Sequence, residues 1–515
     1  MNEQQPTNPH ELDLLTPDEM AEADRITIEG GFAGFSLMIE AGRGVADAAL
    51  AMLKGLAPAV SGDVVCLAGP GKNGGDALVA AEFLRRAGWP VVVRQLGDPL
   101  SSGGDVAEAF RFYRGRSEPI TSDLPQRVTL FIDGLFGAGL SRPIQGELAE
   151  IVEAVNKSSA RILAIDLPSG ICGRTGAVLG TAVKADRTVT FFRGKPGHLL
   201  DPGRSHCGVL DIVQIGIEDT VLQTIRPTCF RNGPALWNDV RRRPQASGHK
   251  YDRGHAVVFS GPAARTGAAR LSASAALRAG AGLVTMFSPP SALLVNASHL
   301  TAIMLKRCEG AEDLFEHLKD DRLNAFVLGP GFGVGKAARQ YAELVLGAGR
   351  LLVLDADGLT SFADDPNRLF AASRNGDREP RPRLVLTPHM GEFARLFPDL
   401  AEDTTLSKLE KTKHASERSG AIVVLKGADT VIASPDGRAA INDTGTPWLA
   451  TAGTGDVLTG ILAAQLAQRT PAFEAACMSV WMHSRAAELF GPGLIAEDLP
   501  GQLPTVLTEL ERLAT

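Results

Sequence analysis

The chain has 515 residues, of which 44% are hydrophobic and 22% are charged, and its formal net charge is -7 at pH 7. This length is too great for one compact core, so we expect two domains of ordinary globular composition. The negative charge argues against a nucleic-acid-binding protein, which normally presents a basic surface. No apolar run in the sequence reaches the length of a membrane-spanning helix.

The cysteines and the first residues bear on the cellular compartment. The six cysteines form no CxxC pair, so the sequence indicates neither a zinc site nor a disulfide framework. Residues 1–6 lack the basic and then apolar pattern of a signal peptide. We therefore expect a protein of the reducing cytoplasm.

The first half of the chain alternates short β-rich runs with helical ones. Two amphipathic segments come first, and we expect them to pack on the core or on a partner subunit. A strand, a glycine-rich loop, a helix and three further strands follow. The segments are helices at about 17–27 and 34–54, a strand at 64–68, a helix at 77–87, and strands at 90–96, 128–132 and 161–165. This alternation predicts a mostly parallel sheet with helices on both faces.

A linker is predicted at 226–246, before a second α/β domain. The stretch 226–248 holds three prolines and the basic run Arg241–Arg243, with little periodicity. The arginines suit a solvated linker better than a phosphate-binding patch. The alternation then restarts, with strands at 255–260, 283–287, 325–328, 351–354, 383–386 and 422–426 and a helix at about 266–280. We expect domains at 1–225 and 247–515.

Three polar loops follow strands of the first domain. The glycine-rich loop Gly69–Asp76 follows the first strand, and Asp133 and Asp166 each end a later strand beside glycines. Ligands of open α/β sheets bind beyond the carboxyl ends of the strands, and glycines let the backbone approach a phosphate closely. The spacing matches neither GxGxxG nor a P-loop. One aspartate at a strand end commonly caps a helix, but three such loops together indicate a site.

Over residues 10–220 this set of loops closely resembles the epimerase domain of the NAD(P)H-hydrate repair enzymes. The resemblance implies that Asp166 is the acid/base that lets the hydrated nicotinamide ring invert at its hydroxyl-bearing carbon. It implies that the substrate is bound by Lys72, Asn73, Gly74, Gly75, Asp76, Gly137, Ala138, Gly139, Leu140, Ser141, Arg142, Pro143 and Asp166, and a potassium ion by Asn73, Asp133 and Ser169. The chain departs from the family at Lys72, usually Asn, and at Ala77, commonly Gly.

The segment Thr451–Asp456 is the most informative one of the second half. It follows a turn-like stretch and precedes an apolar run at 457–462 that predicts a helix. Glycines let N–H groups converge on an anion, and the helix N-terminus adds partial positive charge. Asp456 can there remove a proton from an alcohol while the amides bind the anionic charge that develops. The alternative is a glycine turn with an aspartate that caps a surface helix.

Five further motifs precede this segment in order. They are Gly261–Ala268, Gly329–Gly333, Leu354–Leu359, Leu386–Phe393 and Leu425–Thr430. With Thr451–Asp456, they closely resemble the ribokinase-like ADP-dependent NAD(P)H-hydrate dehydratases over residues 245–515. The resemblance implies that Ala268, Gly333, His389 and Asp456 bind the hydrated nucleotide, and that Lys426, Gly427, Ala428, Asp429, Thr430, Gly453, Thr454 and Gly455 bind ADP. Thr446 stands where the family usually carries Asn.

The two resemblances imply an α/β protein with two domains. The first is a Rossmann-like three-layer α/β/α sandwich and the second a ribokinase-like α/β/α domain. The implied function is metabolite repair by an isomerase and a lyase. The first domain would epimerise the R and S hydrates NADHX and NADPHX. The second would dehydrate the S form, with ADP converted to AMP and phosphate, and with potassium and magnesium as cofactors.

We also expect a homo-oligomer that acts on small molecules and has no nucleic-acid or membrane partner. Two alternatives stay open. The chain is a vitamin or sugar kinase of the ribokinase class with an accessory nucleotide-binding domain, or its first domain is a nucleotide-binding or scaffold module without catalysis.

Overall fold

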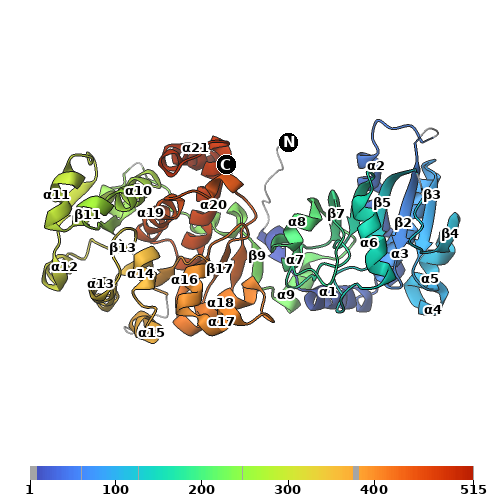
Figure 1. Ribbon diagram of the computed structural model, residues 1–515, viewed down its shortest axis with the longest axis horizontal. Coiled ribbons are helices and arrows are strands. Elements are labelled where there is room, and N and C mark those ends of the chain that lie inside the picture. The colour runs from blue at the N-terminus through green and yellow to red at the C-terminus, as the bar shows by residue number, and fades with distance from the viewer. Residues whose placement is uncertain (1–8, 59–60, 126, 246, 375–381, 514–515) are drawn as a thin grey trace. The chain divides into compact units, whose positions relative to one another are not determined.

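The computed structural model describes residues 9–58, 61–125, 127–245, 247–374 and 382–513. Within them the chain divides into two compact units (Figure 1), which are described separately. The first unit comprises Asp13–Cys229, and the second comprises Pro9–Leu12 and the residues from Phe230 onward. The expectation about a signal peptide at residues 1–6 lies outside the described residues.

The first unit contains a seven-stranded sheet whose paired strands all run parallel, as the alternation predicts. Its order is β4-β3-β2-β5-β6-β7-β8. The strands are β2 (Asp63–Ala68), β3 (Val91–Gln95), β4 (Arg116–Pro119), β5 (Val128–Gly134), β6 (Arg161–Ile165), β7 (Arg187–Phe191) and β8 (Val209–Val213). Since β3 lies on one side of β2 and β5 on the other, the strand order reverses between β2 and β5, and ligands bind at such a point.

Helices cover both faces of this sheet, so the predicted α/β/α layering is confirmed. The helices are α1 (Pro17–Glu29), α2 (Gly34–Met52), α3 (Lys72–Arg86), α4 (Pro99–Ser102), α5 (Gly104–Phe112), α6 (Glu147–Lys157), α7 (Pro196–Leu199), α8 (Gly203–Cys207) and α9 (Leu222–Ile225). Val64 and Cys66 share a buried cluster with α2, α3 and α5, whereas Val65 and Leu67 share one with α6. This is the period of two expected for a strand buried on both faces.

Helix α3 begins earlier than the sequence predicts. The glycine-rich segment was expected to be a loop as far as Asp76, but only Gly69–Gly71 is loop and the helix begins at Lys72. Glycine is a poor helix former, but packing overrides that preference here. A Cβ atom on Gly74 would lie 1.9 Å from the carbonyl oxygen of Gly69, and one on Gly75 would lie 2.6 Å from the Met38 Sδ. The glycines therefore let α3 pack closely against its surroundings.

The second unit is built on a larger, mixed sheet. From β18 to β12 its order is β18-β17-β16-β15-β14-β13-β10-β11-β12, parallel except where β17 pairs with β16 and β18. These strands are β10 (His255–Phe259), β11 (Leu283–Ser288), β12 (Met304–Arg307), β13 (Ala325–Leu328), β14 (Leu351–Leu354), β15 (Leu384–Leu386), β16 (Ile422–Leu425), β17 (Val431–Ala433) and β18 (Ala439–Ile441). The strand order reverses between β10 and β13. The sequence analysis did not predict β12, β17 and β18.

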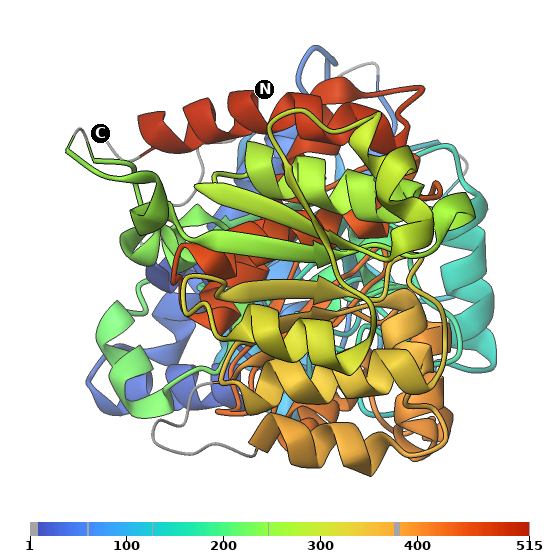
Figure 2. The same cartoon turned by 90° about the vertical axis from the view of Figure 1, so that its left-hand side faces the viewer.

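The helices of the second unit also cover both faces of its sheet (Figure 2). One buried cluster joins Ala256 and Val258 to α10 (Gly267–Arg278), α19 (Thr454–Ala467), α20 (Ala472–Phe490) and α21 (Leu499–Arg512). The other joins Val257 and Phe259 to α12 (Gly310–Leu318), α13 (Lys336–Gly347), α15 (Pro366–Arg374), α16 (Met390–Leu396) and α18 (Lys408–Ser419). The remaining helices are α11 (Pro290–Ala297), α14 (Ala356–Thr360) and α17 (Pro398–Glu402).

Much of the segment predicted as a linker packs into the second unit. Strand β9 (Cys229–Arg231) lies near the start of this segment. Trp237 is fully buried, and its ring meets that of Trp481 edge-on, with centroids 5.8 Å apart. The Arg241 side chain is buried against Glu511 instead of being solvated. Local periodicity in the sequence cannot predict a contact between two tryptophan rings that lie far apart along the chain.

Among the described residues, no helix is both long enough and apolar enough to span a lipid bilayer.

Candidate active sites

The first unit encloses a cavity of about 580 Å³ at the carboxyl edge of its sheet, beside the point where the strand order reverses. Ten of the predicted substrate-binding residues line it. They are Lys72, Asn73, Asp76, Gly137, Ala138, Gly139, Leu140, Ser141, Arg142 and the predicted acid/base Asp166. Gly74, Gly75 and Pro143 are not among the lining residues. The two glycines shape the cavity by letting α3 pack closely.

Asp166 is held in a specific backbone conformation. It follows β6 with a φ of 63°, which is uncommon for a residue other than glycine but is tolerated by aspartate. Its N–H donates to the Val189 carbonyl at 2.7 Å. One carboxylate oxygen accepts from the Lys195 Nζ at 2.7 Å and from the Thr190 hydroxyl at 3.0 Å, and the other accepts from the Ala138 N–H at 2.8 Å. Residues other than glycine that adopt a positive φ often lie at functional sites.

Lys195 is the partner that sequence reasoning missed. Its side chain is only 1% exposed, lines the cavity, and also donates to the Thr190 hydroxyl at 2.8 Å. Burial acts to raise the pKa of Asp166, but the charge and hydrogen bond of Lys195 outweigh it and lower that pKa to about 2. Asp166 is therefore a carboxylate throughout the neutral range. The Gly194-Lys195-Pro196 segment follows β7 and is a fourth glycine-flanked segment after a strand of this sheet.

His198 orients the backbone of this site. Its Nδ1 accepts from the Lys195 N–H at 2.8 Å, and its Nε2–H donates to the Asp166 carbonyl at 2.6 Å. Burial lowers the pKa of His198 to about 4, with a further contribution from Lys195, so the ring is neutral and one nitrogen is free to accept.

Asp76 and Lys72 line the same cavity with different surroundings. Asp76 is buried, and burial raises its pKa well above the usual value, assisted by the charges of Asp166 and Asp24. The exposed Lys72 ammonium pairs with Asp24 at 2.9 Å. Lys72, which stands where the family usually has asparagine, thus lines the cavity and forms an ion pair with Asp24.

The residues predicted to bind potassium fit a hard cation. Asp133 is fully buried and, among the described residues, its carboxylate accepts from neutral donors alone, namely the Ser169 N–H and hydroxyl and the Leu135 N–H. Burial raises the pKa of Asp133 to about 6. Within the described residues, both amide atoms of Asn73 are buried without a hydrogen-bond partner. An orphaned buried amide calls for a missing partner, and its oxygen suits a monovalent cation.

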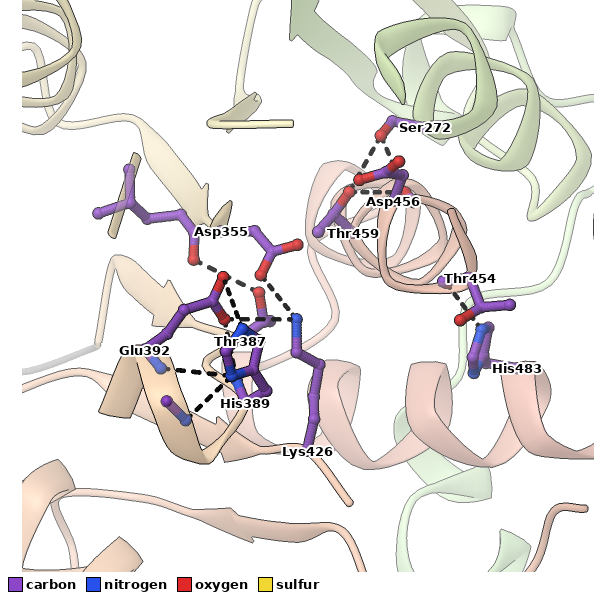
Figure 3. A network of polar contacts seen from close by, with 12 residues as sticks. Ser272, Asp355, Thr387, His389, Glu392, Lys426, Thr454, Asp456, Thr459 and His483 are labelled. Atoms are coloured by element: carbon purple, nitrogen blue, oxygen red, sulfur yellow. Dashed lines mark hydrogen bonds and ion pairs between the residues drawn. The ribbon is translucent and has the colours of Figure 1, made fainter. Parts of the chain in front are cut away.

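The second site forms at the start of α19 (Figure 3). Gly453 has a φ of 91° and turns the chain into the helix, so Thr454, Gly455 and Asp456 form its first turn. Nearly all of α19 is buried, which rules out the alternative of a capped surface helix. The backbone here is held from two sides. The Ser272 hydroxyl donates to the Asp456 carbonyl at 2.8 Å, and the His483 Nε2–H donates to the Thr454 carbonyl at 2.9 Å.

Asp456 is a partly buried carboxyl whose surroundings favour the protonated form. Burial and, to a smaller extent, the charge of Asp355 raise the pKa of Asp456, Lys426 opposes both, and the resulting pKa is about 6. A pKa near neutrality is what a general base requires, because the group is ionised yet still binds a proton strongly.

Lys426 comes directly after β16 and reaches toward the same helix. Its ammonium contacts the Asp355 Oδ1 at 2.8 Å, and the Glu392 Oε2 lies 3.9 Å away. Both acids are buried. They belong to the motifs that carry the resemblance, but the sequence analysis assigned neither a role, because only the fold brings β14, α16 and β16 together.

The other predicted ADP-binding residues form a turn after Lys426. The Thr430 hydroxyl donates to the Gly427 carbonyl at 2.8 Å and accepts from the Gly427 N–H. Asp429 pairs with the ammonium of Lys408, another residue that the sequence analysis did not identify. The hydroxyl of Thr430 thus supports the turn, in which Gly427 and Ala428 are exposed residues.

The predicted nicotinamide-binding residues lie on neighbouring loops. Gly333 has a φ of 108°, and its N–H donates to the Asp357 Oδ2 at 2.9 Å. Ala268 lies in the first turn of α10, beside the Gly329–Gly333 loop. The His389 Nδ1 accepts from the Gly391 and Glu392 N–H groups and so caps α16, while 57% of its side chain is exposed. Thr446, the departure from the family, accepts from the Trp448 N–H at 3.2 Å.

Comparisons with known proteins agree with this division. The family model for NAD(P)H-hydrate dehydratase matches residues 256–505, and the model for the YjeF-related protein N-terminus matches residues 34–197. A solved structure of the ADP/ATP-dependent NAD(P)H-hydrate dehydratase from Bacillus subtilis, co-crystallized with ATP/Mg2+, is 28% identical with a TM-score of 0.46, covering 54% of this chain and 98% of its own.

Full-length relatives extend the similarity across both units. The bifunctional NAD(P)H-hydrate repair enzyme of Thermofilum pendens is 36% identical over 92% of each chain. The enzyme of the same name from Salinibacter ruber is 34% identical over 96% of each chain. That from Vibrio cholerae is 34% identical over 84% of this chain and 86% of its own. This chain therefore belongs to the family of bifunctional NAD(P)H-hydrate repair enzymes.

Proposed function

We propose that the first unit epimerises the R and S forms of NADHX and NADPHX, and that the second dehydrates the S form with ADP. The observation that carries this proposal is the pair of aspartates. Asp166 and Asp456 lie in separate glycine-rich sites, one in each unit, and the first is ionised while the second has a pKa of about 6. Two such sites suit two proton transfers at the same ring hydroxyl.

In the first unit Asp166 would act as both base and acid. The hydroxyl-bearing carbon of the hydrated ring is also bonded to the ring nitrogen. Asp166 would take the hydroxyl proton as the oxygen forms a carbonyl and the carbon–nitrogen bond opens, and would pass that proton to the nitrogen. Reclosure on the opposite face of the carbonyl, with the proton transfers reversed, gives the other epimer.

In the second unit Asp456 would take the ring hydroxyl proton as that oxygen attacks the terminal phosphorus of ADP. The bond from phosphorus to the bridging oxygen breaks, and AMP leaves with its electron pair. The N–H groups of Gly453–Gly455 and the Lys426 ammonium would stabilise the transferring phosphoryl group. The ring nitrogen's electron pair then expels phosphate from the ester, and loss of a proton from the neighbouring ring carbon restores NAD(P)H.

Two cations are part of the proposal. Asn73, Asp133 and Ser169 would hold potassium beneath the first site, where its charge would favour the anionic substrate. Magnesium would arrive with the phosphates of ADP, because no group of three or more His, Cys, Asp or Glu side chains gathers as a metal cage among the described residues. Chelation of magnesium should abolish dehydration, and exchange of potassium for tetramethylammonium should slow epimerisation.

The test follows absorbance at the NADH band after a mixed pool of R and S hydrates meets protein, ADP, magnesium and potassium. Wild type should convert nearly the whole pool. Asp456→Asn should form no NADH, since loss of a positioned base costs about 10²–10⁴ in rate. Asp166→Asn should consume the S hydrate rapidly and then continue only at the spontaneous rate of epimerisation. More than about a tenth of wild-type dehydration in Asp456→Asn would remove that residue from its role.

The same experiment decides between the alternatives. A vitamin or sugar kinase would release a stable phosphorylated product, whereas the dehydratase releases inorganic phosphate and NAD(P)H. A scaffold module in the first unit would let Asp166→Asn convert the whole pool as fast as wild type. Parallel runs with ATP in place of ADP would measure the nucleotide preference.

We also propose that the protein works in the cytoplasm as a homo-oligomer on small-molecule substrates, without nucleic-acid or membrane partners. No disulfide joins any of the six cysteines, all of which lie in the described residues, and five of them are buried, which suits a reducing compartment. Analytical ultracentrifugation and cell fractionation test the two statements.

A further inference from the structure

Asp355 is buried beside Lys426 at the second site (Figure 3). It follows β14 directly, and its side chain is 3% exposed. Its Oδ1 accepts from the Lys426 Nζ at 2.8 Å. The next residue, Ala356, has a φ of 47°, which is rare outside glycine and is retained where the surroundings demand it. The chain is thus bent at the point where Asp355 enters the site.

The distance from this ion pair to α19 is short. A Cβ atom built on Gly455 would lie 3.5 Å from the Lys426 Nζ and 3.8 Å from the Asp355 Oδ2. One oxygen of Asp355 therefore binds the lysine while the other lies near the first turn of the helix. A lysine side chain has four rotatable bonds and loses its position readily when it has no partner.

We propose that Asp355 is a positioning residue for dehydration, whose carboxylate holds the Lys426 ammonium beside the first turn of α19, where the phosphoryl group of ADP would transfer. The inference rests on the proposed function of the second unit. Asp355 acts through Lys426 and Asp456 and not on the substrate itself. Correct placement of a charged group at a transferring phosphoryl group accounts for much of the catalysis of such reactions.

The same pair sets the electrostatic balance at Asp456. After burial, the charges that act on the pKa of Asp456 are Asp355, which raises it, and Lys426, which lowers it. From α20, His483 faces the same turn as a neutral ring, because burial lowers its pKa to about 4. From α10, Ser272 presents an uncharged hydroxyl. Removal of either partner should therefore shift the titration of the base, in opposite directions.

The experiment measures the initial rate of NADH formation from S hydrate and saturating ADP between about pH 4.5 and 8.5, with the full-length protein. In Asp355→Asn the rising limb of the profile should move to lower pH than in wild type, and its plateau should fall by about 10–100-fold. In Lys426→Met the limb should move to higher pH. The KM for the S hydrate should change less than the plateau rate in Asp355→Asn.

If Asp355 had only a structural role, its substitution would lower the rate by the same factor at every pH and would leave the rising limb of the profile at the same pH. That result in Asp355→Asn overturns the inference, as does a shift of both variants in the same direction. Asp355→Glu keeps the charge, so its limb should stay near that of wild type while its plateau falls. If Asp355→Asn does not fold, the other two variants test the inference. It is refuted if the rising limb moves to lower pH in Asp355→Glu, or if the limb does not move in Lys426→Met.

Asp364→Asn is the matched control, because Asp364 is exposed and lies nine positions further along the chain. Its rate and limb should equal those of wild type. Asp456→Asn separates the two levels of the claim. If wild type forms no NADH, or Asp456→Asn retains activity, the proposed function fails. If both behave as expected and the limb of Asp355→Asn does not move, only the role of Asp355 fails.

Discussion

At the scale of single residues, the two aspartates show how surroundings set chemistry. Burial acts on both to raise the pKa. At Asp166 the buried ammonium of Lys195 reverses that effect, whereas at Asp456 the neighbouring Asp355 adds to it and Lys426 only partly compensates. The aspartate of the first site is therefore half ionised at about pH 2, whereas the aspartate of the second site is half ionised only at about pH 6.

The two activities should consequently depend differently on pH. A base works only when deprotonated, so dehydration should rise as the pH passes upward through about 6, where Asp456 ionises. Epimerisation should show no limb from Asp166 in that range, because its pKa is about 2. Separate rate profiles with S hydrate and with R hydrate measure this. A dehydration rate that stays constant between about pH 5 and 7 would contradict the assignment of Asp456.

Lys195→Met should impair epimerisation by at least about 10²-fold and leave dehydration intact. The substitution leaves Asp166 as a buried carboxylate without its counter-charge, which also destabilises the first unit by about 3–5 kcal/mol. Rates with each hydrate and a thermal melt give both effects. Lys157→Met makes the same chemical change on the exposed surface of α6 and should alter neither. Full epimerisation in Lys195→Met would remove the lysine from the site.

At the scale of elements, loops and helix starts deliver the site residues. In the first unit, α3 can begin at Lys72 because Gly74 leaves room for the backbone of Gly69. In the second, Gly453 takes the left-handed conformation that lets α19 start with its N–H groups toward the site. Glycine here serves packing and turn geometry as much as contact with ligand.

Gly74→Ala should therefore disrupt the first unit. The new Cβ would lie 1.9 Å from a backbone oxygen, so α3 must shift, and we expect a loss of about 1–3 kcal/mol together with most of the epimerisation. Chemical denaturation and the R-hydrate rate measure these effects. Gly71→Ala is the matched control for stability, because a Cβ there meets nothing within 4 Å. Equal stability of the two variants would refute the packing argument.

At the scale of the whole molecule, each unit has its own core and its own site. Every residue assigned above to the first site belongs to the first unit, and every residue assigned to the second site belongs to the second. We therefore expect the two sites to work independently, with the link between the units supplying proximity rather than chemistry.

Full-length Asp166→Asn and Asp456→Asn should for that reason complement each other. Each variant alone should leave part or all of a mixed hydrate pool unconverted. Their mixture should convert the pool nearly completely, because R hydrate can be epimerised on one molecule and dehydrated on another. The NADH trace of the mixture, set against that of each variant alone, is the measurement. No gain on mixing would mean that the substrate must pass within one chain.

The sequence by itself predicted an α/β protein with two domains and named most of the residues that we propose for both sites. Buried parallel strands are continuous apolar runs, and glycine-flanked acids at their ends need no tertiary information to be noticed. Only the tertiary structure identified Lys195, Asp355 and Lys408 as partners, the packing of Trp237, and the early start of α3. These depend on contacts between residues far apart in the chain, and on local preferences that packing overrides, neither of which periodicity or spacing records.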